Sequence, residues 1–381
     1  MRTHRYFLFV LLWLWLIGTA PAHDSSAWGG LFRSRDFGAS WLPADPGLYV
    51  SGALALAVHP LDPATLLYGT DTRFLRTLNG GRDWTGAGES EVLGGVFATA
   101  FDAQGVTEFA ATAGNFFRRR RDERWREISL PSGAAPLRAI LRSSQVMRLY
   151  AASTRGVLRS DDGGDSWNLV GELPEGAVMS LALATRPQEH LYAIVDGEVW
   201  ASDDGAHTWR QHGAGLPDRR AQAVTGGTDQ VWVAGDDRVY KLNHDGNWSA
   251  LGVMLPERDT AIRGFAVSDN GQIFVLATHR GVYRSSDRGA SWELIEGSLP
   301  VHLEAGPLVR DPHDAATLYV GFGIQPYDEL WRRAARGAGV LSELSALSIV
   351  GAGAFLLLLL AGGAMLVKCL SDKAAVSRRE K

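Results

Sequence analysis

The sequence predicts an all-β fold, a seven-bladed β-propeller, because one unit of about forty residues recurs along the chain. Seven tryptophans follow one another at intervals of 43, 41, 42, 42, 39 and 44 residues. They are Trp41, Trp84, Trp125, Trp167, Trp209, Trp248 and Trp292. A polar turn precedes each tryptophan, and strand-like apolar segments fill the intervals. A fixed period of this length indicates a repeated supersecondary unit.

The turn before each tryptophan has residues suited to a tight hairpin. Residues 34–41, 160–167 and 285–292 read Ser-x-Asp-x-Gly-x-Ser-Trp; the copy at 202–209 moves the glycine one place earlier, and the copy at 77–84 has Asn for Asp. Glycine accepts positive φ, and the Asp side chain closes the turn onto backbone N–H groups. The tryptophan then buries a large ring. We expect structural roles for Asp36, Trp41, Asn79, Trp84, Asp162, Trp167, Asp204, Trp209, Asp287 and Trp292.

This turn pattern resembles the Asp-box, or bacterial neuraminidase, repeat. The segments beside the turns also fit this repeat, because Gly-Val-Leu-Arg at 156–159 and Gly-Val-Tyr-Arg at 281–284 precede two of them. Residues 58–70 resemble the inner hairpin of the same proteins. The resemblance covers residues 28–333 and implies a propeller fold. It does not select a function, since sialidases, xyloglucanases, sortilin-type receptors and the photosystem II assembly factor family all carry the repeat.

The strand pattern predicts seven blades of four strands, with two inner and two outer strands in each. Inner pairs are expected at 54–70, 96–112, 137–153, 179–195, 221–235, 262–278 and 302–323. The chain opens with an outer pair at 30–42 and ends with an inner pair, so both ends of the chain must complete one blade. That closure removes the open seam of the ring. Residues 329–332 resemble a further outer strand, which either lies beside the closing blade or leads out of it.

The start of the sequence is typical of a secretory signal peptide. A basic beginning is followed by an apolar run at 6–17 and by a small-x-small cleavage site that ends at Ala22. The apolar run is short for a membrane span, so we expect cleavage after Ala22. An uncleaved N-terminal anchor is the alternative.

The end of the sequence predicts a membrane-spanning helix. Residues 346–367 carry no charge over 22 positions, and a helix of that length spans about 33 Å, enough for a bilayer core. The next segment has five Lys or Arg residues against two acidic ones, which is typical of the cytoplasmic side. A buried core helix is the alternative. The predicted order is a signal peptide at 1–22, a propeller at 23–333, a linker at 334–345, a transmembrane helix at 346–367 and a basic cytoplasmic tail at 368–381.

Composition and cysteine usage narrow the class of protein. The net charge of -4 and the mixed surface residues give no indication of nucleic-acid binding. Cys369 is the single cysteine, so no intramolecular disulfide can form, whereas exported eukaryotic domains usually carry several. We therefore expect a bacterial, single-pass inner-membrane protein whose propeller lies on the periplasmic or extracellular side.

The sequence shows no catalytic set. The resemblance to sialidases implies three arginines around a substrate carboxylate, a Tyr–Glu pair and an acidic Asp, but the nearest match, Phe32-Arg33, lies inside the first turn unit and lacks the proline of the sialidase motif. Xyloglucanases use two aspartates in larger chains with two propellers. No histidine has the spacing of a metal ligand. We therefore predict no catalytic residues, no metal and no cofactor.

Four adjacent arginines stand where the third turn should be. They are Arg118, Arg119, Arg120 and Arg121. On one hairpin turn they form a concentrated positive patch that can pair with carboxylates or phosphates, so they are the predicted binding residues. The alternative is a degenerate, solvated turn without a partner.

Two classes of function follow from these observations. The favoured hypothesis is a membrane-anchored, non-catalytic scaffold whose propeller binds or assembles an envelope or membrane protein. The alternative is a propeller that binds or hydrolyses glycans, as in the sialidase and xyloglucanase groups. An acidic pair with aromatic platforms at the channel favours the alternative, whereas a channel mouth of apolar and mixed polar side chains favours the scaffold.

Overall fold

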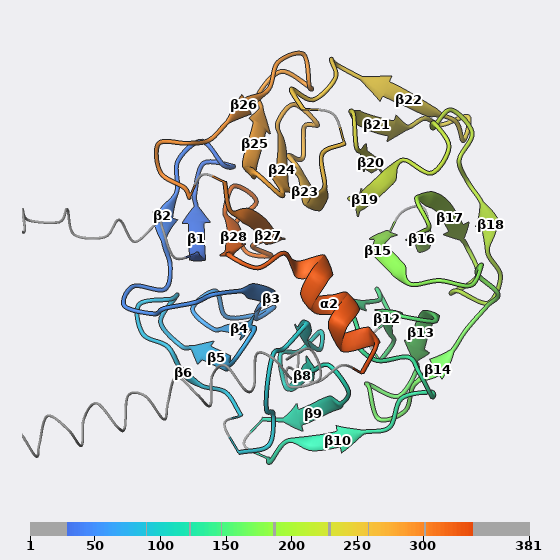
Figure 1. Cartoon of the computed structure of the whole chain (residues 1–381). Coiled ribbons are helices and arrows are strands. Elements are labelled where there is room, and N and C mark those ends of the chain that lie inside the picture. Colours follow the sequence, from blue (N-terminus) through green and yellow to red (C-terminus); the bar gives the residue numbers. More distant parts are fainter. Residues whose placement is uncertain are drawn as a thin grey trace, which may run out of the picture. The chain divides into compact units, whose positions relative to one another are not determined.

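The chain folds into a ring of seven β-sheets. The computed structural model describes residues 29–337, apart from residues 89, 122, 146, 186, 187, 228, 229, 258 and 301. Within this part, seven antiparallel sheets of four strands each surround a central channel (Figure 1). The prediction of an all-β, seven-bladed propeller is therefore confirmed.

Six blades are each formed by four consecutive strands. Blade 1 has β3 (Ala53–Val58), β4 (Leu66–Thr70), β5 (Phe74–Thr77) and β6 (Thr85–Gly86), and blade 2 has β7 (Ala98–Phe101), β8 (Thr107–Ala111), β9 (Phe116–Arg120) and β10 (Arg126–Ile128). Blade 3 has β11 (Ala139–Arg142), β12 (Leu149–Ser153), β13 (Gly156–Ser160) and β14 (Asn168–Leu169), and blade 4 has β15 (Val178–Ala184), β16 (His190–Val195), β17 (Glu198–Ser202) and β18 (Arg210–Gln211). Blade 5 has β19 (Ala221–Gly226), β20 (Val231–Gly235), β21 (Val239–Leu242) and β22 (Trp248–Leu251), and blade 6 has β23 (Ile262–Val267), β24 (Phe274–Thr278), β25 (Gly281–Ser285) and β26 (Glu293–Leu294).

The closing blade combines both ends of the described chain. It contains β27 (Glu304–Arg310), β28 (Leu318–Gly323), β1 (Gly30–Ser34) and β2 (Leu42–Pro43), in the order β2-β1-β28-β27. β1 and β28 lie side by side in Figure 1, and Phe32 is opposite Val320 in their antiparallel pairing. The ring of Phe32 also meets Phe322 edge to face at 5.5 Å. The predicted closure by both chain ends is thus present.

Apolar side chains between neighbouring blades form the core. The second strand of each blade is almost wholly buried, because each of its faces packs against an adjacent sheet; β4 and β12 are buried at every position. The tryptophans after the turns help to join the blades. Trp167 of blade 3 meets Phe116 of blade 2 edge to face at 5.5 Å, and Trp84 of blade 1 donates a hydrogen bond to the Ala44 carbonyl oxygen beside the closing blade.

One helix, α2 (Tyr327–Ala335), follows the closing blade where the sequence pattern resembled an outer strand. That expectation for residues 329–332 is wrong. Tyr327 and Trp331 are four positions apart and share the buried face of the helix, a helical spacing that four residues of sequence cannot reveal. Asp328 and Glu329 in the first turn and two arginines in the last turn also suit the helix dipole.

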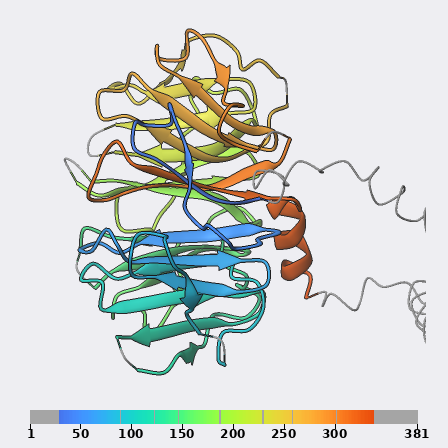
Figure 2. The same ribbon diagram turned by 90° about the vertical axis from the view of Figure 1, so that its left-hand side faces the viewer.

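The helix α2 lies against one face of the ring (Figure 2). No helix among residues 29–337 is long and apolar enough to cross a membrane. The predicted signal peptide at 1–22, transmembrane helix at 346–367 and basic tail at 368–381 lie outside the described residues. Of the predicted linker at 334–345, the first two residues belong to α2.

Candidate functional site

The channel has two mouths with different surroundings. All seven innermost strands run in the same direction through the ring, so their first residues surround one mouth and their last residues surround the other. The helix α2 crosses the first of these in Figure 1, and we call it the capped mouth. The second contains a cavity of about 440 Å³, and we call it the open mouth.

The open mouth is lined by the final residues of six innermost strands. Apolar side chains such as Leu56, Phe101 and Leu183 provide much of the wall. Two arginines, Arg142 and Arg310, are its charged groups, and none of the described residues that line it is an aspartate or a glutamate. The lining of the open mouth is therefore apolar and mixed polar.

The two arginines of the open mouth differ in their partners. Arg310 donates to Asp269 at 2.7 Å and to the Ala315 carbonyl oxygen at 3.0 Å. Arg142 donates to the Asp102 carbonyl oxygen at 3.4 Å, forms no ion pair among the described residues, and has the charge of Asp102 as its electrostatic neighbour. Burial lowers the pKa of Arg142. Its guanidinium therefore has donors available for a carboxylate that enters the mouth.

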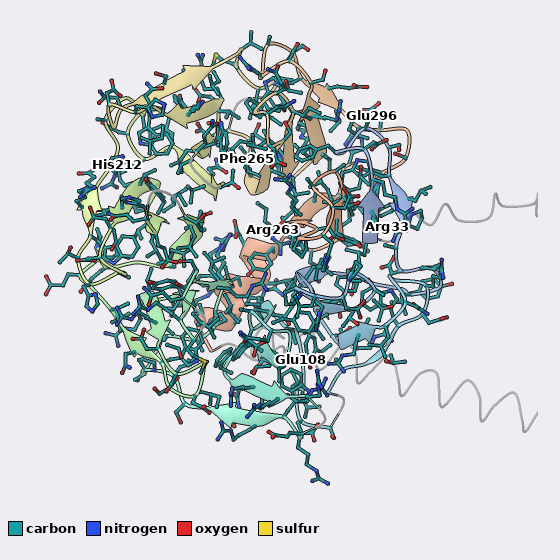
Figure 3. All side chains as sticks on the ribbon, turned by 180° about the vertical axis from the view of Figure 1, so that it is seen from behind. Arg33, Glu108, His212, Arg263, Phe265 and Glu296 are labelled. Atoms are coloured by element: carbon teal, nitrogen blue, oxygen red, sulfur yellow. The ribbon has the colours of Figure 1, made fainter. Side chains whose placement is uncertain are left out.

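A second pocket of about 340 Å³ extends from the open mouth between blades 5 and 6 and the closing blade. It shares Thr225, Gly226 and Arg310 with the mouth. Trp232, Phe265 and Asp269 also line it. Figure 3 shows Phe265 on the inner side of its blade. Trp232 and Phe265 are buried, so they form walls rather than exposed platforms for a sugar ring.

The capped mouth holds a cluster of charged and aromatic side chains. Arg263 donates to the carbonyl oxygens of Ala53, Leu54 and Gly306 at 2.7–3.2 Å, and its guanidinium lies 3.5 Å from the centre of the Tyr327 ring. Figure 3 shows Arg263 beside α2 near the centre of the ring. Burial lowers the pKa of Arg263 to about 10.

Two further charged groups, Glu304 and Asp328, complete this cluster with Arg138. Arg138 donates to Asp328 at 2.5 Å, and Glu304 lies 3.7 Å from Arg263. Burial raises the pKa of Glu304. Although arginines, carboxylates and a tyrosine meet here, Tyr327 and Trp331 are buried beneath the helix, so the capped mouth is closed to substrate in this structure.

The four sequential arginines do not share one turn. Arg118, Arg119 and Arg120 belong to β9, and Arg121 follows it with a φ of 28°. Arg118 forms an ion pair of 2.9 Å with Asp165 in blade 3. Arg119 pairs with the buried Glu108 at 2.6 Å and lies over the Trp125 ring. Arg120 and Arg121 are exposed, so these two of the four predicted binding residues face solvent.

The turn residues use their polar groups within their own hairpins. Asp162 accepts hydrogen bonds from the backbone N–H groups of Asp165 and Ser166 and from the hydroxyls of Ser160 and Ser166. Burial alone would raise the pKa of Asp162, but these hydrogen bonds lower it to about 2. Asp36, Asn79, Asp204 and Asp287 accept equivalent bonds. None of these five side chains lines the open mouth.

A recurring arginine is the feature that sequence reasoning missed. It stands immediately before the Ser that opens the turn and reaches the next blade. Arg33 donates to Gly80 O at 3.4 Å, Arg159 to Gly205 O at 2.8 Å and Arg284 to Phe37 O at 3.0 Å. Arg118 has the equivalent register position and also reaches the next blade. The repeated Arg-Ser pair at 33–34, 159–160 and 284–285 was the available signal.

These features define the chain as a seven-bladed β-propeller with one open and one helix-capped channel mouth. No protein-family model matches it. In sequence it is similar to a xyloglucanase from a Paenibacillus species, with 28% identity over 207 residues, which is 50% of this chain and 20% of that relative. The chain thus matches about a fifth of the length of that curated relative.

Solved structures with similar architecture include two of YCF48. One is YCF48 bound to a D1 peptide, and the other is YCF48 from Cyanidioschyzon merolae; both have a TM-score of 0.55 and 16% identity. The alignments cover 72% and 75% of this chain and 94% and 99% of those chains. At this identity, the likeness shows the fold.

Proposed function

We propose that this protein is a non-catalytic, protein-binding propeller that holds a peptide segment of an envelope protein in its open mouth. The observation that carries the proposal is the lining of that mouth, in which apolar side chains surround Arg142 and the described lining has no carboxylate. Most glycoside hydrolases use a pair of carboxyl groups at the scissile bond, whereas a peptide needs apolar contacts and a few placed polar groups. We infer that Arg142 binds an acidic group of the peptide.

The structural likeness to YCF48 supports peptide binding as the general role. A solved complex places a D1 peptide on that protein, whose fold is similar to the fold of this chain. The identity of 16% is too low to transfer the peptide or its binding residues. The choice of the open mouth therefore depends on the cavity and on Arg142 alone.

Site-specific photo-crosslinking tests this function. A photo-reactive amino acid at Ile140, in the wall of the open mouth, should capture a peptide segment of a membrane or envelope protein in cells, and mass spectrometry should identify the segment. The matched control position is Leu169, which is exposed on an outer strand. Arg142→Ala should reduce the Ile140 crosslink at least tenfold, whereas Arg142→Lys should retain part of it. Equal capture at both positions, or capture independent of Arg142, would refute binding in the mouth.

We further propose that the propeller is anchored in the inner membrane and faces the periplasm. The support is the sequence, with its signal-peptide pattern at 1–22 and its uncharged segment at 346–367 followed by a basic tail. Protease added to intact spheroplasts should digest the propeller and leave the tail protected. Protection of the propeller with loss of the tail would contradict this topology.

The second candidate function is glycan binding or hydrolysis. It is favoured by the 28% identity to a xyloglucanase over half of this chain. The adjoining pocket has an aromatic residue, Trp232, and an acidic residue, Asp269, in its wall. We expect the purified protein to release no sugar from xyloglucan or from sialosides. Turnover that a single substitution such as Asp269→Asn abolishes would establish this alternative.

A further inference from the structure

At the capped mouth, residues from several blades bind one face of α2, and we call this set of residues the groove. Tyr327 and Trp331 of α2 pack with Leu54 and Phe97 at the starts of blades 1 and 2. The Tyr327 ring meets Phe97 edge to face at 5.9 Å, and its hydroxyl donates to the Phe97 carbonyl oxygen at 3.3 Å. The backbone N–H of Tyr327 donates to Glu304 at 3.0 Å. Residues from several blades thus recognise one face of a nine-residue helix.

The ring provides more positive than negative charge in this groove. Arg138 and Arg263 come from the blades, and among the described residues of the ring Glu304 is the carboxylate that pairs with them. The second carboxylate, Asp328, comes from α2. The cluster is therefore neutral only while the helix is in place. Without α2, the groove has two guanidinium groups against one carboxylate and attracts an acidic ligand.

The two arginines depend on α2 to different degrees. Arg263 is held by three backbone carbonyl oxygens of the ring, so it stays in position without the helix. The side chain of Arg138 has its ion pair with Asp328 and lies over the rings of Tyr327 and Trp331, and these contacts all come from α2. Its Nη1 is buried without a hydrogen-bond partner among the described residues. Arg138 is thus the side chain of the ring whose contacts depend on the helix that fills the groove.

The helix itself depends on the groove. Helices shorter than about 12 residues are marginal in water, and α2 has nine. Three residues connect β28 to α2. The first of them, the exposed Ile324, donates its backbone N–H to the Ser51 carbonyl oxygen. Release of α2 therefore breaks no sheet pairing, and it leaves the seven blades with their own hydrogen bonds.

We propose that the capped mouth is a second peptide-binding site, which α2 fills as an internal ligand and which binds a short amphipathic helix of a partner protein. The partner helix presents two aromatic side chains and a carboxylate with the spacing of Tyr327, Trp331 and Asp328. Recognition of this kind uses anchors at i and i+4 on one helix face. The site is separate from the open mouth and does not depend on the function proposed for it.

Competition between α2 and the partner determines the apparent affinity. A short flexible tether gives an internal ligand an effective concentration on the order of millimolar. A partner helix of equal intrinsic affinity is therefore largely excluded, and its apparent affinity rises as the fraction of protein with an empty groove rises. Substitutions that weaken the contact of α2 with Arg138 should open the site to a peptide in solution.

A labelled peptide with the sequence of residues 324–337 is the probe for this site. Fluorescence anisotropy should show weak binding to the full-length wild-type protein and at least tenfold tighter binding to the full-length Asp328→Arg variant, whose helix repels Arg138. The same peptide carrying Asp328→Arg should not bind either protein. An unchanged far-ultraviolet circular dichroism spectrum establishes that the variant retains the propeller.

Charge exchange gives the decisive control. Arg138→Asp in the full-length Asp328→Arg protein should abolish binding of the unchanged peptide, because the introduced carboxylate repels the Asp328 carboxylate of the peptide and pairs with the new guanidinium of α2. If Asp328→Arg prevents folding, the Trp331→Ala protein replaces it, since it loses an anchor of α2 without a change of charge. The proposal is overturned if neither variant binds the peptide more tightly than the wild type, or if the charge-reversed peptide binds equally well.

Discussion

Individual turn residues show why the aspartates of the repeated turns are unavailable for chemistry. The carboxylate of Asp162 is surrounded by donors of its own turn, and its pKa is correspondingly low. Trp167 is 4% exposed and packs on the preceding blade. Asp36, Asn79, Asp204 and Asp287 accept the same kind of hydrogen bond within their own turns. The residues that we propose bind ligands, Arg142 and Arg138, lie outside the repeated turns.

Substitution of the turn residues should change stability in a fixed order. Trp167→Ala should lower the free energy of unfolding by about 3 to 5 kcal/mol, because it removes a buried aromatic side chain. Asp162→Ala should cost about 1 to 3 kcal/mol, because it leaves turn N–H groups without their acceptor. Denaturant unfolding followed by circular dichroism measures both values. Variants that unfold like the wild type but lose a bound partner would show that the turn is a binding site.

Acid should destabilise the propeller through these same carboxylates. Burial alone would raise the pKa values of Asp36, Asp162 and Asp204, but hydrogen bonds within the turns lower each to about 2. The pKa of an unfolded Asp is about 3.9. Since the folded-state pKa is lower, the stabilisation is complete above about pH 4 and is lost as the pH falls from about 4 to about 2.

Asp162→Asn gives the matched test of this pH dependence. Asparagine keeps an acceptor oxygen in the turn, as Asn79 does in the second copy, but it does not titrate. Unfolding free energies measured between pH 5 and pH 2 should therefore fall less steeply for the variant than for the wild type. An identical slope would mean that other carboxylates govern the acid response.

Elements differ in how well the sequence predicts them. The strands next to each turn were predictable, because the period of the turns and the alternation of apolar segments agree. The helix α2 was not, because a short segment with a single tryptophan fits a strand or a helix, and the groove that stabilises it is assembled from several blades. The sequence did indicate where Arg118 lies, because this residue occupies the position of the recurring arginine before the turn.

The four arginines at 118–121 should separate into structural and surface groups. Arg118→Ala should lower the melting temperature, because it removes the ion pair that joins blade 2 to Asp165 of blade 3. The double variant Arg120→Ser with Arg121→Ser should melt like the wild type, because both residues are exposed. If these two residues form a docking patch, less crosslinked partner should be recovered with the double variant than with the wild type. The amount recovered with the wild type should also fall as the salt concentration rises. If the Arg118→Ala protein melted like the wild type, Arg118 would not be a residue that joins the two blades.

At the scale of the whole molecule, ring closure was predictable and the proposed ligand sites were not. The order of outer and inner pairs along the chain requires both ends to share a blade, and the structure has this arrangement. The open mouth receives three residues from each of six blades, such as Arg142 from blade 3 and Arg310 from the closing blade. Such a site leaves no local motif, so the arrangement of the blades is needed to reveal it.

Closure of the ring should depend on β1, and a separate peptide with the sequence of this strand should be able to replace it. A chain that lacks residues 29–43 leaves β28 with an unpaired edge and Phe322 without its contact to Phe32, so it should melt at a lower temperature and associate through the open edge. A synthetic peptide of residues 29–43 should restore part of the melting temperature in proportion to its concentration, because it binds only the folded ring. A peptide with Phe32→Asp is the control and should not restore it, since the charge would enter a buried position. If the shortened chain melted like the wild type, the pairing of β1 with β28 would not be what closes the ring.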